Sequence, residues 1–425
     1  MSKSAFMLRM ASAILIVGGC FRAHVGLAED TELRTIRKSP DKRVLSINRK
    51  TPWDMRALER TPKVYPAPNR PVRGMRSLFY EGADYKGAPT RVFAYYGTPA
   101  GKPPAGGWPA VVCAHGGGGT AFSTWVKYWN DRGYAAIAMD LEGHLPGTHW
   151  FQVEGNYPAG QGHEHAGPAR VGWFGDIALP DTEQWFYHAV ADVIRANSLL
   201  RSFPEINADK IGLTGISWGG TIASAVAGVD SRFVFVVPVY GGGYIHKHDM
   251  TPEQYAEYLA KWDPSAHLPH AKMPMLWVSS YSEPVFRVDL FSKSAATSGG
   301  QSLLCLRPWL IHGHGYGWEE AWEIYAFANS IVLGTDPLPV FERPVVDMEN
   351  GSVSAGFKGD VTGALLSYTT AGGPWKDRKW ANVECEIKAG KVVGISTLPR
   401  ATKAFVINAY MKSNLVSSEI VVLNE

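Results

Sequence analysis

The sequence predicts an α/β fold, in which helices cover both faces of a mostly parallel sheet, followed by a small antiparallel β-sandwich. Over residues 76–335, runs of buried apolar residues alternate with segments of helical periodicity, a pattern typical of parallel sheets. From residue 340 onward, short strand-like segments with Gly or Asn turns replace this alternation and indicate a sandwich over 340–425. The 425 residues suffice for one large domain and one small domain.

The first 75 residues precede the predicted α/β domain. Residues 1–28 are typical of a signal peptide, because Lys3 and Arg9 supply positive charge before a short apolar stretch that ends in small residues. This stretch is too short to span a bilayer, so we expect a secreted or periplasmic protein without stable membrane insertion. A lipoprotein anchored through Cys20 is the alternative. Residues 29–75 are polar and proline-rich and indicate an extended arm.

The elements of the α/β domain follow in order along residues 76–335. Strands at 77–80 and 90–96 flank a glycine-containing turn and should form an antiparallel pair at one edge of the sheet. Buried strands are predicted at 109–114, 135–140, 210–216, 233–239, 275–279 and 302–306. Helices are predicted at 122–129, 181–203, 218–228, from 252, from 288 and at 319–333. The C-terminal region contains strand-like segments such as 364–370, 383–387, 405–410 and 419–423.

The segment Gly215-Ile216-Ser217-Trp218-Gly219 has the pattern G-x-S-x-G in the context that this motif requires. An apolar strand runs into it, and a run of small residues that can form a helix follows it. In such a strand–turn–helix the serine backbone is strained, and its neighbours must lack a Cβ atom. We therefore predict that Ser217 is a nucleophile whose hydroxyl stands clear at the end of a strand.

A serine nucleophile needs an imidazole to take its proton and a carboxylate to orient that imidazole. In a sheet of this kind the acid and the histidine follow the serine in that order, each after a strand. Glu283 and His312 occupy these places and are the predicted acid and base. Asp289 remains an alternative for the acid, and His314 remains an alternative for the base.

The run from His115 to Gly119 follows the strand at 109–114 and consists of one histidine and four glycines. Acyl transfer creates a negative oxygen that needs two preplaced N–H donors. We predict that Gly117 supplies one donor and Trp218 the other, and that His115 pins the loop. A phosphate-binding loop is disfavoured because the Lys-Ser/Thr of a P-loop is missing.

Four further residues are expected to line the substrate site. These are His115, Gly116, Tyr240 and His314. The insertion at 141–181 lacks periodicity and is rich in Gly, His, Pro and Trp, so we expect a functional loop that lines the same site.

No cofactor and no metal site are expected. A metal site would need His144, His149, His163, His165 or the His246-Lys247-His248-Asp249 run, but no helical histidine pair or cysteine pair supports one. The cysteines remaining after Cys20 are expected to be unpaired thiols. The net charge is +3 with no long basic run, which gives no reason to expect nucleic-acid binding.

Several segments resemble secreted α/β-hydrolases of the acetyl xylan esterase type. The resemblance is carried by residues 185–196, by the G-x-S-x-G segment and by His312-Gly313-His314-Gly315, and it covers roughly residues 76–335. These proteins are related to cephalosporin C deacetylase, dienelactone hydrolase and the catalytic domain of prolyl oligopeptidase. The resemblance implies a serine esterase that acts on acylated carbohydrate, with deacetylation as the expected activity. Glu283 departs from the pattern, since relatives usually carry Asp there.

Two other functions stay open at this point. A peptidase of the prolyl oligopeptidase type would share the triad, but it usually carries a large propeller domain before the hydrolase domain, and the arm at 29–75 is far too short for one. A catalytically degenerate sugar-binding protein is the second alternative, and the intact set of Ser217, Glu283 and His312 argues against it. The expected partner is therefore a small-molecule or polysaccharide ester, and the sequence does not indicate an oligomeric state.

Overall fold

The computed structural model describes residues 51–67, 70–146, 162–245, 250–347, 349, 351–388, 392–395 and 398–423. These residues belong to the compact unit Arg49–Glu425. The predicted signal peptide at 1–28 and the first part of the predicted arm lie outside the described residues. Within the described part of the chain, no helix is both long enough and apolar enough to cross a membrane.

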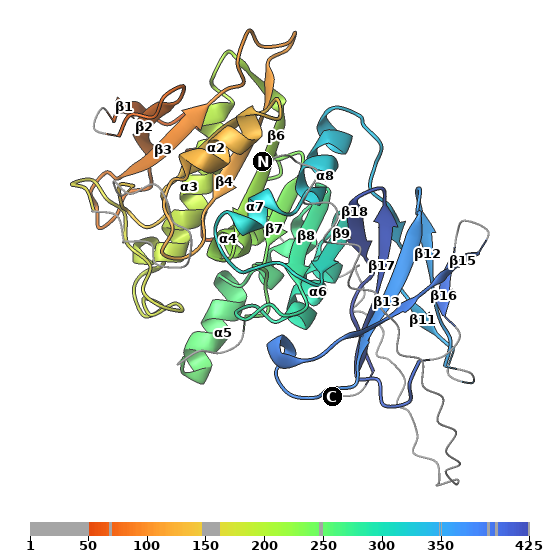
Figure 1. The fold of residues 1–425 in the computed structure, drawn as a ribbon. Helices are drawn as coiled ribbons and strands as arrows, with labels where there is room; N and C mark the ends of the chain where they lie inside the picture. Colours follow the sequence, from red (N-terminus) through yellow and green to blue (C-terminus); the bar gives the residue numbers. More distant parts are fainter. Residues whose placement is uncertain are drawn as a thin grey trace, which may run out of the picture. The chain divides into compact units, whose positions relative to one another are not determined.

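A single twisted sheet forms the centre of the unit (Figure 1). Its first nine strands lie in the order β1-β2-β3-β5-β4-β6-β7-β8-β9. The strands from β5 to β9 are parallel, while β1, β2 and β3 are antiparallel to their neighbours. The predicted parallel sheet with an antiparallel pair at one edge is therefore confirmed. The bounds are β1 (Val64–Pro66), β2 (Arg76–Glu81), β3 (Arg91–Gly97), β4 (Trp108–Ala114), β5 (Ala135–Met139), β6 (Ile206–Ile216), β7 (Val236–Val239), β8 (Met275–Ser280) and β9 (Ser302–Arg307).

Helices cover both faces of this sheet (Figure 1). On one face α2 and α8 meet through Trp129 and Tyr325, whose ring centroids are 4.9 Å apart. On the other face α3 and α4 meet through Trp185 and Trp218, at 5.3 Å. The bounds are α1 (Met55–Leu58), α2 (Ser123–Asn130), α3 (Trp185–Leu200), α4 (Trp218–Ala227), α5 (Pro252–Lys261), α6 (Val288–Thr297), α7 (Tyr316–Glu319) and α8 (Glu323–Val332). Single 3₁₀ turns are η3 (Asp181–Glu183), η4 (Pro264–Ala266), η5 (Leu268–His270) and η6 (Trp375–Asp377).

Local sequence signals account for where several helices begin. The Thr251 hydroxyl accepts a hydrogen bond from the Gln254 N–H at 3.2 Å, and the Gln254 side chain accepts one from the Thr251 N–H at 2.9 Å. This capping box satisfies two donors at the start of α5, with Pro252 at the first helical position as predicted. The helix predicted from Asp181 begins instead with the turn η3, and α3 starts at Trp185.

The C-terminal region consists of strands arranged in two layers. One layer has the order β10-β12-β16-β15, with β11 beside β12, and the other has the order β18-β17-β13-β14, with β19 beside β17. Apolar side chains such as Phe357 and Ile407 pack between the layers, so the predicted fold class is confirmed in this region also. The bounds are β10 (Val340–Phe341), β11 (Val345–Val346), β12 (Val353–Lys358), β13 (Gly363–Thr369), β14 (Ala381–Glu384), β15 (Glu386–Lys388), β16 (Val392–Ile395), β17 (Ala404–Met411), β18 (Asn414–Ser417) and β19 (Val421–Val422).

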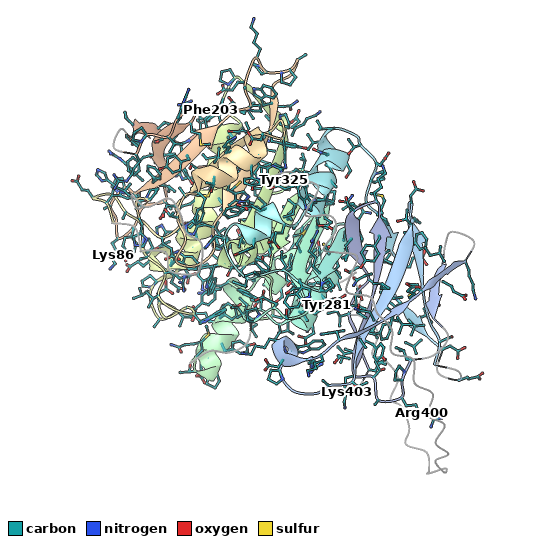
Figure 2. The ribbon with its side chains drawn as sticks, viewed as in Figure 1. Lys86, Phe203, Tyr281, Tyr325, Arg400 and Lys403 are labelled. Carbon is teal, nitrogen blue, oxygen red and sulfur yellow. The ribbon has the colours of Figure 1, made fainter. Side chains whose placement is uncertain are left out.

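The C-terminal strands are joined to the central sheet. Strand β18 pairs with β9 through Ser417 and Leu304, so one sheet runs through both regions. Tyr281, at the end of β8, also reaches the C-terminal strands, because its hydroxyl bonds to Ser367 Oγ at 3.2 Å (Figure 2). The domain boundaries predicted from the sequence, 76–335 and 340–425, stay a prediction.

Candidate active site

Ser217 lies at the turn between β6 and α4, with φ 57° and ψ −118°. Its N–H donates to the Val239 carbonyl at 2.8 Å, which fixes this strained backbone against the neighbouring strand. A Cβ on Gly215 would lie 2.0 Å from the Gly219 oxygen, and a Cβ on Gly219 would lie 2.0 Å from the Ala114 oxygen. The turn therefore requires glycine at both positions of the motif, as the sequence pattern indicates.

The structure brings Ser217, His312 and Glu283 together in a chain of hydrogen bonds. His312 Nε2 lies 3.0 Å from Ser217 Oγ, and His312 Nδ1 lies 2.8 Å from Glu283 Oε1. The alternative acid, Asp289, lies in the first turn of α6 and is bound instead by Arg287, at 3.1 Å from Nε and 2.6 Å from Nη2. This arrangement can transfer a proton from a serine hydroxyl to an imidazole that a carboxylate orients.

The acid is held by its own loop. The Glu283 side chain is buried, and its Oε1 also accepts hydrogen bonds from the Val285 N–H at 2.8 Å and the Phe286 N–H at 3.1 Å. Three donors thus converge on one carboxylate oxygen, and two of them are backbone groups that cannot move independently of the loop. This geometry fixes the distance and direction from which Glu283 approaches His312.

Aromatic rings support His312 from two sides. The Tyr240 ring lies 4.8 Å from the imidazole, and the Phe286 ring is stacked on it at 6.3 Å. The Tyr240 hydroxyl donates to the Ile311 carbonyl at 2.6 Å, next to the histidine in the chain. Through this hydrogen bond Tyr240, which is completely buried, supports the loop that carries His312. The predicted contact of Tyr240 with substrate stays a prediction.

One N–H of the glycine run has no acceptor among the residues that the structure describes. The Gly116 N–H donates to His314 Nε2 at 2.8 Å, the Gly118 N–H to Glu142 Oε1 at 2.9 Å, and the Gly119 N–H to the Gly116 carbonyl at 3.0 Å. Within the described residues the Gly117 N–H has no such partner. A Cβ on Gly117 would lie 2.6 Å from Trp218 Cδ1, so the Trp218 side chain lies against Gly117.

The two histidines beside the run act as hydrogen-bonding supports. His115 Nε2 accepts from the Leu141 N–H at 2.8 Å, and its Nδ1 therefore donates to the Gly116 carbonyl at 2.7 Å. Burial, followed by the neighbouring His115 and His312, lowers the pKa of His314 to about 3. His314 is thus neutral at physiological pH and accepts the Gly116 N–H. Among the hydrogen bonds of the described residues, those of both rings go to the glycine run or the chain beside it, and the predicted contact of His115 and His314 with substrate stays a prediction.

Two residues near this run were not predicted from the sequence. Glu142 Oε1 receives the Gly118 N–H and also Arg170 Nε, the latter at 3.0 Å. The Arg170 guanidinium lies 5.7 Å from the centre of the Trp218 ring, and its Nη2 would be 2.8 Å from a Cβ on Gly117. A cation is therefore held beside Gly117 and the Trp218 ring. Both residues belong to the insertion at 141–181, whose course no local sequence pattern reveals.

The described part of the insertion also carries aromatic side chains to the site. Trp173 lies 4.8 Å from the Trp218 ring and 5.6 Å from the Phe286 ring. Together with Tyr244, Val285 and Phe291, Trp173 and Phe286 line a pocket of about 220 Å³. The described part of the insertion therefore lines this pocket, and its role in binding substrate stays a prediction.

The described residues contain no group of three or more His, Cys, Asp or Glu side chains that could hold a metal ion. His149 and the run from His246 to Asp249 lie outside the described residues. The described cysteines, Cys113, Cys305 and Cys385, are free thiols, and burial raises the pKa of each. The structure therefore offers no activated thiol among them.

Known proteins provide an independent comparison. The model of the family Acetyl xylan esterase (AXE1) matches residues 75–257. An acetyl xylan esterase from a Paenibacillus species is 23% identical over 65% of this chain and 92% of its own, with a TM-score of 0.50. Acetyl xylan esterase 1 from a Thermoanaerobacterium species is 17% identical over 64% of this chain and 91% of its own, with a TM-score of 0.48.

A dienelactone hydrolase from Anabaena variabilis is 14% identical over 62% of this chain and 99% of its own, with a TM-score of 0.39. The curated proteins contain no match. The likeness to the Paenibacillus structure supports the fold, and the family model supports the kind of enzyme. Residues 75–257 thus match the acetyl xylan esterase family and the fold is that of an α/β-hydrolase, and together they support a carboxylic ester hydrolase.

Proposed function

We propose that the protein is a serine esterase that removes acetyl groups from carbohydrate, with Ser217 as nucleophile, His312 as base and Glu283 as the orienting acid. The observation that carries this proposal is the unbroken chain of hydrogen bonds from Ser217 Oγ through His312 to the buried carboxylate of Glu283, at 3.0 Å and 2.8 Å. The carbohydrate ester as substrate rests on the similarity to the acetyl xylan esterase family.

The first half of the reaction forms an acyl-enzyme. His312 Nε2 takes the hydroxyl proton as Ser217 Oγ attacks the carbonyl carbon of the ester. The resulting oxyanion accepts hydrogen bonds from the N–H groups of Gly117 and Trp218. When the tetrahedral intermediate collapses, the bond to the sugar oxygen breaks, and His312 returns the proton to that oxygen. The sugar leaves as an alcohol, and the acetyl group stays on Ser217.

The second half repeats these steps with water. His312 takes a proton from the water molecule, whose oxygen attacks the acyl carbon, and the same two N–H groups stabilise the second oxyanion. Collapse returns the proton to Ser217 Oγ and releases acetate. Throughout, Glu283 keeps the proton of the neutral imidazole on Nδ1 and stabilises the imidazolium that forms after each proton transfer.

The test of this proposal uses the wild-type protein and the variant Ser217→Ala. A fluorophosphonate probe should label the wild type and leave the variant unlabelled, and p-nitrophenyl acetate should be hydrolysed only by the wild type. Residual activity above about a hundredth of the wild type in the folded variant would overturn the assignment of Ser217. Acetylated xylo-oligosaccharides, feruloylated sugars and methyl uronates, compared as substrates, then test the acetyl ester, and faster cleavage of the last two would contradict it.

A further inference from the structure

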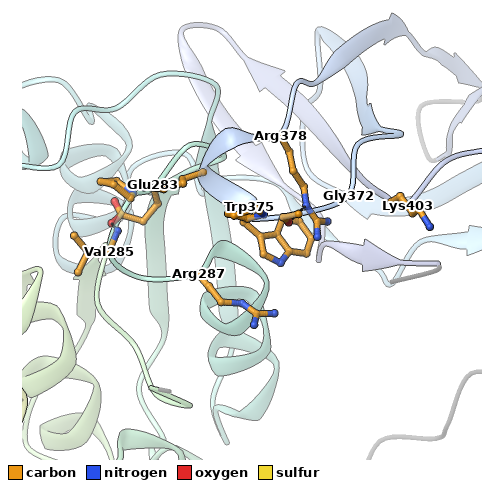
Figure 3. Close-up of a pocket in the computed structure, with 11 residues that line it drawn as sticks. Glu283, Val285, Arg287, Gly372, Trp375, Arg378 and Lys403 are labelled. Atoms are coloured by element: carbon orange, nitrogen blue, oxygen red, sulfur yellow. Dashed lines mark hydrogen bonds between the residues drawn. The ribbon is translucent and has the colours of Figure 1, made fainter. Parts of the chain in front are cut away.

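A cleft of about 460 Å³ opens beside the loop that carries Glu283. One wall comes from this acid loop, and the other comes from the C-terminal strands and the turn η6 (Figure 3). The residues that matter below are Val285 and Arg287 on the first wall and Trp375, Lys376, Arg378 and Lys403 on the second.

The charges that line this cleft are mostly positive. Lys376, Arg378 and Lys403 are all basic, and within the described residues none of the three forms an ion pair. Arg287 is already paired with Asp289, at 2.6 Å. The carboxylate of Glu283 is the one acidic side chain among the lining residues, and it is engaged by His312. Three cations without a carboxylate partner therefore face one cleft, which favours an anionic ligand.

The basic wall is ordered before any ligand binds. The Arg378 guanidinium is stacked on the Trp375 ring at 3.9 Å, and its Nε donates to the Gly373 carbonyl at 3.0 Å. Trp375 is buried against Trp380, which in turn stacks on Tyr281 at 4.7 Å. A guanidinium fixed in this way loses little conformational entropy when it binds a carboxylate or sulfate group.

The cleft adjoins a pocket beside the candidate active site. Val285 and Arg287 line both the cleft and the smaller pocket that contains Trp173 and Phe286. Phe286 is stacked on His312, at 6.3 Å. A sugar chain whose ester lies at Ser217 can therefore extend past this phenylalanine towards the basic wall.

We propose that the cleft is a subsite for an anionic sugar residue, such as a uronic acid, in the same chain as the acetylated sugar. The inference rests on the proposed function, because it concerns how that substrate is selected. The carboxylate, or the sulfate ester of a sulfated sugar, accepts charge-assisted hydrogen bonds from Arg378, Lys376 and Lys403. The C-terminal region would then determine which polysaccharide the esterase prefers.

Binding is measured first in the Ser217→Ala variant, which needs no turnover. Trigalacturonate, a sulfated trisaccharide and the neutral xylotriose are titrated by calorimetry at low ionic strength. At least one anionic trisaccharide should bind about tenfold more tightly than xylotriose, and this advantage should shrink as salt is added. The tighter of the two identifies the anion. Equal affinity for all three trisaccharides would overturn the proposal.

The double substitution Lys376→Gln with Lys403→Gln tests the location. It should weaken the anionic trisaccharide about tenfold and leave xylotriose unchanged, because two charged donors are lost. Lys379→Gln removes an exposed charge that does not line the cleft, and it is the matched control. Unchanged affinity in a double variant with a normal melting temperature would place the anion elsewhere and contradict the proposal.

Turnover separates this inference from the proposed function. In the active enzyme the double substitution should raise KM for an acetylated, uronate-bearing oligosaccharide about tenfold, while kcat and the rate with p-nitrophenyl acetate stay unchanged. Anion binding without esterase activity would keep the subsite and remove the proposed function. Esterase activity without preference for the anionic substrate would keep the proposed function and remove the subsite.

Discussion

The N–H of Gly116 donates a hydrogen bond to Nε2 of His314, with the two nitrogens 2.8 Å apart. This contact uses the second histidine of the His312-Gly313-His314 segment as an acceptor for the glycine run, whereas the first contacts Ser217. An acceptor nitrogen carries no proton, so His314 holds its proton on Nδ1 and remains neutral while it does this. The two histidines are thus expected to respond differently to substitution.

His312→Ala should remove as much activity as Ser217→Ala, on the order of 10⁵-fold or more in kcat, because the members of a triad act as a unit. His314→Ala should cost only about ten- to a hundredfold, since it leaves the Gly116 N–H without its acceptor. Steady-state kinetics with p-nitrophenyl acetate measure both. The reverse ranking would move the base to His314.

His314 should also make the protein sensitive to acid. Its pKa is about 3 in the folded chain, against about 6.5 in an unfolded chain. Between these values only the unfolded chain binds the proton, so stability is complete above about pH 6.5 and falls as the pH decreases towards 3.

Thermal or urea unfolding between pH 8 and pH 4 measures this effect in the wild type and in His314→Gln. Glutamine can accept the Gly116 N–H and does not titrate, so the variant should lose less stability on acidification. A residual slope is expected from His163 and His188, since burial lowers the pKa of each. Parallel curves for the two proteins would contradict this role of His314.

Glu283→Gln should lower kcat by roughly three to four decades, because the shape is kept while the charge that stabilises the imidazolium is lost. Glu283→Asp should also lose activity, since the shorter side chain cannot reach His312 from the same loop. Asp289→Asn is the matched control, because Asp289 is bound by Arg287 and should affect only the start of α6. A collapse of activity in Asp289→Asn alongside a normal Glu283→Gln would assign the acid to Asp289.

Glu142→Gln tests the support of the glycine run. The amide can still accept the Gly118 N–H, but the ion pair with Arg170 is lost, so the predicted oxyanion donors should be held less firmly. We expect kcat to fall about tenfold with KM unchanged. The affinity for a boronic acid that mimics the tetrahedral intermediate should fall by the same factor. A loss of stability with normal kcat and normal boronate affinity would make the role of Glu142 purely structural.

Features that depend on residues close together in the sequence could be predicted from it. The turn at Ser217 is one example, because Gly215 and Gly219 are required by contacts within or beside the motif itself. The order of the predicted strands is a second example. It places Glu283 and His312 each just after a strand, and the two side chains meet there in the structure. The contact of Arg170 with Glu142 could not be predicted, since it depends on how a long loop without periodicity folds back.

The C-terminal strands show the same limit. Strands β12, β16 and β18 were absent from the predicted set, and each is short or rich in small residues. Their partners are distant in the chain, as in the pair Ser417 and Leu304. Patterns within a segment indicate that a strand can form, but long-range pairing decides whether it does.

The pairing of β18 with β9 has a consequence for how the protein matures. Until β18 arrives, the parallel sheet ends in an open strand whose backbone groups could bind another chain. Ser417 Oγ then accepts the Leu306 N–H at 2.8 Å, and the buried Glu323 accepts the Leu415 N–H at 2.8 Å. Because synthesis runs from the N-terminus, the backbone groups along the free edge of β9 stay uncovered until the ribosome has released residues 414–417. The edge strand β9 is therefore exposed to aggregation from its own synthesis until β18 follows, and a chain cut before β18 would keep that open strand permanently.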